Sequence, residues 1–203
     1  MAGPARYTAV LDACVLYPVS VADALLSLAV AGLYAARWTL AIEDEWIRNL
    51  EQRRPELQGR LETRRQDMRA AVPDWEVPAP AWQRIAPTLE LPDPGDTHVL
   101  AAAVAGHADC IVTSNLKDFP AAALAPYGIE ALHPDDFLLA QIDLNELTAL
   151  AAFRDMRARK RNPALDPEAF AHALERNGLV ATANRLRLAA STNTPGRPAA
   201  AAA

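Results

Sequence analysis

The sequence predicts a three-layer α/β/α domain with a central parallel sheet, followed by a small all-helical C-terminal extension. Over roughly residues 7–140, short apolar segments alternate with segments of helical spacing, the pattern of a parallel sheet with helices on both faces. Beyond about residue 141 the pattern is helical only. The chain has 203 residues, of which 51% are hydrophobic and 22% charged, so it can build one core of ordinary size.

The first third of the chain contains one clear strand and three expected helices. Residues 7–12 form a short apolar strand that ends on an acid. Residues 18–36 begin with a proline and keep apolar side chains at helical spacing, which predicts a helix. Thr39 can cap a second helix that ends near Arg53, and residues 56–71 form a third, very polar helix after a proline.

The middle of the chain supplies the remaining strands of the sheet. Three further strands are expected, at residues 75–77, 109–114 and 128–132. The proline-rich segment 78–95 predicts a short helix followed by a turn, and residues 96–106 form an apolar helix.

The extension is expected to contain three helices separated by prolines. Pro134 begins a helix that closes the α/β domain, and the later helices span residues 145–159, 167–177 and 180–190. We therefore expect an α/β domain over residues 1–140, a helical extension over 141–190 and a disordered tail over 191–203, which is rich in proline and alanine.

Composition excludes several classes of protein. The longest apolar stretch, residues 22–33, is too short to span a membrane, and the N-terminus lacks a signal-peptide apolar region, so we expect a cytoplasmic protein. Two cysteines make no disulfide framework, and no Cys/His cluster has zinc spacing.

Arginine dominates the cations despite a net charge of −5. Of 20 cations 18 are Arg, and residues 48–69 hold seven Arg against four acids. Arg60, Arg64 and Arg65 in this segment are candidate phosphate contacts, because the guanidinium fork suits phosphate. The alternative is that abundant Arg and Ala reflect the base composition of the genome.

Four acids lie at positions where parallel sheets commonly bind ligands. Asp12 follows the first strand, Glu45 lies early in a helix, Asp96 opens the apolar helix and Asp118 follows a strand. Ligands bind beyond the carboxyl ends of parallel strands, so these acids can converge. Repelling carboxylates need a cation, and oxygen ligands without Cys or His favour Mg²⁺ or Mn²⁺.

Each acid also has a purely structural alternative. Asp96 can be a helix cap, and Asp12 can be a turn residue. The run Glu43–Glu45 can be a charged first turn that suits the helix dipole. Asp118 can be a loop acid without a partner. The order of the four acids together, rather than any one of them, favours a site.

Four segments together resemble the PIN-domain ribonucleases, and among them the VapC-type toxins of toxin–antitoxin systems. These segments are VLDACVLYP (10–18), EDEWIRNL (43–50), LPDPGDTHVLAAAVAGHADCIVTSNLKDFP (91–120) and HPDDFL (133–138). The resemblance covers roughly residues 7–140, and the helical segment that follows resembles an extension carried by a subgroup of these toxins. It implies a type II toxin that acts as a Mg²⁺- or Mn²⁺-dependent endoribonuclease, an antitoxin whose C-terminal segment plugs the site, and a homodimer.

The resemblance assigns roles residue by residue. Asp12, Glu45 and Asp96 match the first three acids of the family's metal site. Many PIN domains place the fourth acid at the position of Asn115, whereas here the resemblance moves it to Asp118. The same resemblance suggests the following supporting residues: Asp93 as a helper acid, Thr113 through its hydroxyl, Asn115 beside the fourth acid, and His98 as a substrate contact. For His98 the alternative is a partly buried helix histidine.

The sequence departs from the family pattern at one further position, and two other functions are alternatives to the toxin. Cys14 occupies a position where a polar Asn or Ser is common in the family, which puts one supporting hydrogen bond in question. Because Asn115 replaces an acid, a catalytically weak PIN domain that binds RNA or protein is the alternative function. The other function is a phosphatase of the haloacid-dehalogenase kind. It requires Asp-x-Asp after the first strand, and because residue 14 is Cys, the sequence disfavours this function. The residues do not distinguish transfer, ribosomal and messenger RNA as the substrate.

Overall fold

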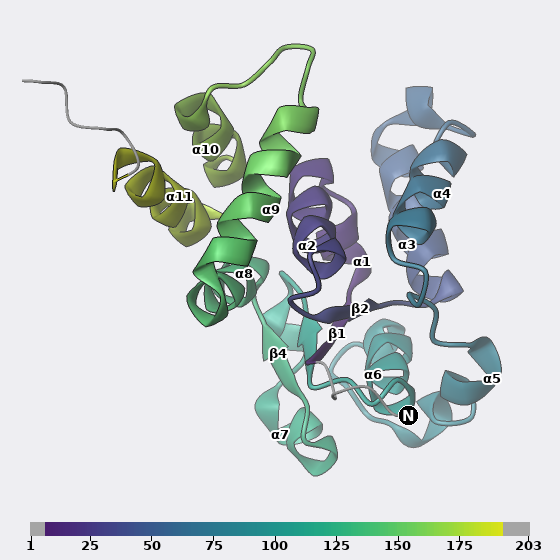
Figure 1. Cartoon of the computed structure of the whole chain (residues 1–203). Coiled ribbons are helices and arrows are strands. Elements are labelled where there is room, and N and C mark those ends of the chain that lie inside the picture. The colour runs from purple at the N-terminus through teal and green to yellow at the C-terminus, as the bar shows by residue number, and fades with distance from the viewer. Residues whose placement is uncertain (1–6, 193–203) are drawn as a thin grey trace, which may run out of the picture.

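A four-stranded parallel sheet forms the centre of the computed structural model, which describes residues 7–192 (Figure 1). The strands are β1 (Thr8–Leu11), β2 (Ala35–Arg37), β3 (Cys110–Val112) and β4 (Glu130–Leu132), in the order β2-β1-β3-β4. In the register, Val10 pairs with Arg37 on one side and Ile111 on the other. Apart from Thr8, the central strands β1 and β3 consist of apolar residues, and these are buried, as a sheet covered on both faces requires.

Helices cover the sheet on both sides, which confirms the predicted fold class. Helix α6 (Thr97–Ala105) packs against β1 and β3, and α2 (Val19–Val30) contacts β2. Figure 1 shows α2 and α6 on different sides of the strands. The order β2-β1-β3-β4 places the carboxyl ends of β1 and β3 side by side, so the loops that follow these two strands meet.

Strand β2 corrects the prediction of one helix over residues 18–36. Helix α2 ends at Val30, where Gly32 takes a φ of +80°. The amide of Leu33 donates to the carbonyl of Leu28 and that of Gly32 to the carbonyl of Ala29, the Schellman arrangement that closes a helix. The apolar residues that follow keep helical spacing by coincidence and enter the sheet instead.

The expected strand at residues 75–77 is also wrong, because only a single bridge forms there, between Trp38 and Glu76. A short helix, α1 (Ala13–Leu16), follows Asp12 directly and was not predicted. The capping prediction for Thr39 is confirmed: its side chain accepts from the amide of Ile42 at the start of α3 (Leu40–Arg53).

The polar helix expected over residues 56–71 is divided in two. A 3₁₀ turn, η1 (Pro55–Leu57), is followed by α4 (Glu62–Ala71), and Gly59 between them has a φ of +68°. The remaining short elements of the domain are α5 (Ala79–Trp82), η2 (Ala86–Thr88), η3 (Pro94–Asp96), η4 (Leu116–Asp118), α7 (Ala121–Leu124) and η5 (Ala125–Tyr127).

The C-terminal part is helical, as predicted. It contains α8 (Pro134–Leu144), α9 (Glu146–Arg159), α10 (Pro167–Glu175) and α11 (Val180–Thr192). Helix α9 packs along α2, where Asp23 lies 2.9 Å from Arg159 and 2.5 Å from Lys160. The boundary expected at residue 141 falls inside α8. Residues 193–203 of the expected tail lie outside the described part of the chain.

No helix among residues 7–192 is both long enough and apolar enough to cross a membrane.

Candidate metal centre

Three acids from two short turns converge beyond the carboxyl end of the sheet. Asp93, Asp96 and Asp118 each offer a carboxylate oxygen, and these oxygens all lie within 4.8 Å of one another. The first two acids belong to the turn before α6, and the third belongs to η4 after β3. Asp96 and Asp118 are half-buried, and Asp93 is exposed. The structure thus brings together two of the four acids expected from the sequence and the suggested helper.

Hydrogen bonds in the turn before α6 leave Asp96 available. Asp93 accepts from the amide of Gly95 at 2.8 Å, which holds the turn closed. Asp96 stands at the N-cap position of α6 but makes no side-chain capping hydrogen bond. The capping alternative for Asp96 is therefore not what its side chain does in this structure, and the carboxylate faces its two acidic neighbours instead.

Asp118 is held by Asn115. The side-chain amide of Asn115 donates to Oδ2 of Asp118, and its backbone amide donates to the hydroxyl of Thr113 at 3.0 Å. Phe119, next to Asp118, is buried in the core and fixes the loop. Asn115 therefore supports Asp118, the acid expected to take the fourth position.

Asp12 is almost fully buried, with 4% of its surface exposed, at the end of β1. Its Oδ2 accepts from the hydroxyl of Thr113 at 2.7 Å and from the thiol of Cys14 at 3.0 Å. Cys14 also accepts from the amide of Ser114 at 3.2 Å, so it links the ends of β1 and β3. Cys14 thus supplies the supporting hydrogen bond that its replacement of Asn or Ser had put in question. The sequence already allowed this contact, because a cysteine thiol can donate a hydrogen bond, as the side chain of Asn or Ser can.

The thiol form of Cys14 is the stable one. Burial, together with the charge of Asp12, raises the pKa of Cys14 to about 12. At neutral pH the thiol of Cys14 therefore keeps its proton and can donate a hydrogen bond to Asp12.

The negative charges of all the other candidate acids affect the pKa of Asp96. Burial, and then the negative charges of Asp12, Asp93, Asp118 and Glu45, raise its pKa from 3.8 to about 6. Asp12 and Glu45, which lie outside the tight group of three oxygens, are therefore close enough to act on it. The cluster carries more negative charge than its surroundings balance, the condition in which a bound cation is favourable.

We expect Asp96→Asn to stabilise the metal-free protein at pH 7.5, raising its melting temperature by roughly 2–4 °C. The folded protein holds the Asp96 proton up to a pKa of about 6, whereas the unfolded chain releases it near 3.8. This group therefore lowers stability as the pH rises through that window, and the variant removes the loss. Differential scanning fluorimetry in EDTA at pH 4.5 and 7.5 should show a gain at pH 7.5 only. A lower melting temperature at pH 7.5 would contradict the repulsion.

Glu45 faces His98. Its Oε2 lies 3.4 Å from Nε2 of His98, and Nδ1 of the same ring lies 2.7 Å from the carbonyl of Gly95. Burial opposes the charged imidazolium, but the contacts with Glu45 and Gly95 and the charge of Asp12 outweigh it and raise the pKa of His98. The ring is turned toward the acids and is mostly buried.

The neighbouring acids on α3 do different work. Glu43 is fully buried and accepts from the indole of Trp38 at 2.9 Å and from Nε of Arg69 at 3.0 Å. Asp44 is exposed and lies 3.6 Å from Arg65. Of the three consecutive acids, Glu45 is the one whose charge acts on Asp96.

The three candidate RNA-binding arginines differ in their surroundings. The guanidinium of Arg64 donates to the carbonyls of Leu16 and Tyr17 and lies 4.6 Å from the ring centre of Trp46. Arg65 lies near three acids on α3 and α4, Glu43, Asp44 and Glu62. Arg60 is exposed in the loop before α4. Arg64 and Arg65 are therefore engaged within the molecule.

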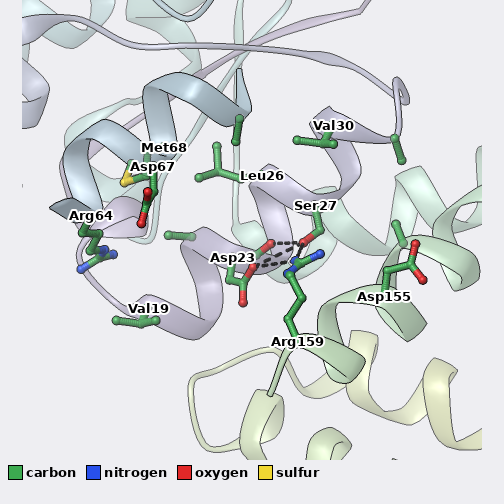
Figure 2. Close-up of a pocket in the computed structure, with 14 residues that line it drawn as sticks. Val19, Asp23, Leu26, Ser27, Val30, Arg64, Asp67, Met68, Asp155 and Arg159 are labelled. Carbon is green, nitrogen blue, oxygen red and sulfur yellow. Dashed lines mark hydrogen bonds and ion pairs between the residues drawn. The ribbon is translucent and has the colours of Figure 1, made fainter. Parts of the chain in front are cut away.

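A separate groove lies between α2, α4 and α9 (Figure 2). It has a volume of about 620 Å³. Its walls include apolar side chains and charged ones, among them Val19, Leu26, Val30, Met68, Asp67 and Asp155. None of the candidate metal-site acids lines it, so it is a different surface from the acid cluster.

Comparison with known proteins identifies the family of this chain. The family model described as "PIN domain" matches residues 8–117, and the one described as "VapC50 C-terminal domain" matches residues 134–188. The chain is 52% identical over 79 residues to a Mycobacterium tuberculosis protein named "Putative ribonuclease VapC50". The match covers 39% of this chain and about half, 47%, of that relative. No solved structure matches. With a PIN-domain match over more than half of its length, the chain belongs to the PIN-domain family and carries a C-terminal domain of the VapC50 kind.

Proposed function

We propose that this protein is the toxin of a type II toxin–antitoxin system and cleaves RNA phosphodiester bonds with a divalent metal ion. The observation that carries the proposal is the convergence of acids from separate segments. The carboxylates of Asp93, Asp96 and Asp118 lie within 4.8 Å, and the charges of Asp12 and Glu45 act on Asp96. Membership of the PIN-domain family and the name of the relative both support it.

Mg²⁺ or Mn²⁺ is the proposed ion, because the cluster offers carboxylate oxygens alone. The proposed ligands are Asp12, Glu45, Asp96 and Asp118, with Asp93 assisting. The raised pKa of Asp96 supports the fit, since a cation relieves the repulsion that raises it. When bound, such an ion lowers the pKa of a water molecule and stabilises the charge that develops on phosphate oxygens.

The protein's own groups hold these acids in place before any ion binds. Thr113 and Cys14 fix Asp12 through its Oδ2, and Asn115 fixes Asp118. Such outer contacts orient the ligands of a metal ion and commonly affect its affinity by 10–100-fold. Because they preorganise the carboxylates, less conformational freedom is lost on binding.

Contact with RNA phosphates is proposed for the arginines near α4. Arg60 is exposed, and its side chain takes part in no hydrogen bond or ion pair among the described residues, so it can meet a phosphate without giving up such a contact. Arg64 and Arg65 would have to exchange their present partners. An antitoxin protein is the proposed partner, as the relationship to VapC-type proteins implies.

The proposal is tested by incubating the full chain with a pool of labelled RNAs of defined sequence. Cleavage is expected with Mg²⁺ or Mn²⁺, should stop in EDTA and should return when excess Mn²⁺ is added. Ca²⁺, which also binds oxygen ligands but with looser geometry, serves as a control ion. Tight RNA binding without metal-dependent cleavage would favour the alternative, a PIN domain that acts as a binding module.

The assignment of the fourth ligand to Asp118 instead of Asn115 gives a separate prediction. Asp118→Ala should lower cleavage by at least about a hundredfold, and higher Mn²⁺ should restore part of it, since a metal ligand is lost. Asn115→Ala removes only the hydrogen bond to Asp118 and should cost about tenfold. Initial cleavage rates across a Mn²⁺ titration measure both. If Asn115→Ala were the more damaging change, Asp118 would not be the fourth ligand.

A further inference from the structure

We propose that His98 is a positioning residue for Glu45, and that it fixes Glu45 relative to the turn that carries Asp93 and Asp96. This inference rests on the proposed metal site. It replaces the expectation that His98 itself contacts the substrate.

The two nitrogens of the His98 ring face two parts of the site. Nδ1 lies 2.7 Å from the carbonyl oxygen of Gly95, the residue directly before Asp96 in the chain. Nε2 lies 3.4 Å from Oε2 of Glu45, which belongs to α3. Because an imidazole is rigid, one ring sets the separation between α3 and the turn before α6.

Burial explains why the ring keeps this orientation. The Nε2 atom is buried and makes no well-aligned hydrogen bond to any described residue, which leaves the carboxylate of Glu45 as its ion-pair partner. Leaving a buried N–H group without any acceptor is costly. The carboxylate of Glu45 is the acceptor within reach of Nε2, so the attraction between the two groups keeps Glu45 beside the ring. Trp82 packs beside the ring, with 6.2 Å between the ring centres. Only 19% of the His98 side chain is exposed, which suits a contact inside the protein better than a contact with RNA.

Glu45 needs such a partner because its neighbours repel it. The His98 ring brings Glu45 to the side of the turn that carries Asp93 and Asp96, and carboxylates brought together repel one another. About a quarter of the Glu45 side chain is exposed, which gives it a path toward solvent. Among the described residues His98 is its one ion-pair partner. Without His98, we expect Glu45 to turn outward and the metal site to lose one of its proposed ligands.

Two conservative variants separate the contacts of the ring. His98→Gln places an amide nitrogen near the position of Nε2 and keeps a donor for Glu45. His98→Asn places one near Nδ1 and keeps only the contact with Gly95. The readouts are the Mn²⁺ concentration that gives half of the maximal rise in melting temperature, and kcat and KM for RNA cleavage.

We expect His98→Asn to weaken the Mn²⁺ response by about tenfold and His98→Gln to stay within about threefold of the wild type. KM for RNA should stay unchanged in both. In a Glu45→Gln background, His98→Asn should add almost nothing, because both changes remove the same interaction.

Equal effects of the two variants, additive effects with Glu45→Gln, or a raised KM would each overturn the positioning role. A wild-type protein that shows no Mn²⁺ response would remove the proposed metal site and this inference with it. A normal wild-type response with both variants unaffected would reject the role of His98 and leave the metal site in place.

Discussion

Replacing Asp12 with Asn is expected to reduce RNA cleavage by about a thousandfold or more while the fold survives. Asn has nearly the same shape, and the Thr113 hydroxyl, which now donates to Asp12 at 2.7 Å, can also accept from an amide. The substitution removes the negative charge of a proposed metal ligand. Stabilisation by a bound ion is worth several kcal/mol, and each 1.36 kcal/mol is a factor of about ten in rate.

Single-turnover cleavage at saturating Mn²⁺ measures the loss, and circular dichroism with thermal melting checks the fold. Asp136→Asn is the matched control, because it makes the same change at an exposed acid on α8. Full activity in folded, purified Asp12→Asn protein would remove Asp12 from the mechanism.

The largest effect on stability is expected for Asp135→Ala. Asp135 is 8% exposed, and its carboxylate accepts from the backbone amides of Ala181 at 2.7 Å and Thr182 at 2.8 Å. These amides belong to the first turn of α11, where no intrahelical acceptor exists, and the helix dipole favours a negative charge there. Hydrogen bonds to a charged group contribute about 1.5–3 kcal/mol each, so we expect a loss of roughly 3–5 kcal/mol.

Urea unfolding of the two alanine variants, Asp135→Ala and the exposed neighbour Asp136→Ala, measures this difference. A loss below about 1 kcal/mol in Asp135→Ala would mean that water replaces the carboxylate at α11. We also propose that the helical extension over residues 141–190 is an accessory that contributes nothing to the metal site, and the same variants test this. If so, folded Asp135→Ala protein should keep the Mn²⁺ response of the wild type, and a lost response would place the extension within the site.

Much of the fold could be predicted because its signals are local. A buried apolar run of three or four residues followed by a helical pattern identifies a parallel sheet with its helices. The order of the strands in the sheet came from the structure alone. The caps work over similarly short ranges: Thr39 and Asn145 each bond an amide three residues later. The acids were found for the same reason, because strand ends and helix starts are visible in the sequence.

Strand β2 could not be predicted from its own residues. Residues 33–36 continue the apolar spacing of α2, and a helix and a buried strand compete equally for such a segment. The pairing of Thr8 with Ala35 across the sheet decided between them. That pairing joins two segments that are distant in the sequence, and the spacing of apolar residues within one segment carries no information about it.

The acids show the same division between sequence and tertiary structure. The sequence by itself determined the fold class, the approximate bounds of α3, α6, α9, α10 and α11, and a set of acids at strand ends and helix starts. Only the tertiary structure decided that Glu43 is buried against Arg69, that Glu45 turns toward His98, and that Arg64 binds the end of α1. The physical reason is range: capping and periodicity act within about one helical turn, whereas burial and charge pairing depend on residues brought together from distant segments, which no local pattern records.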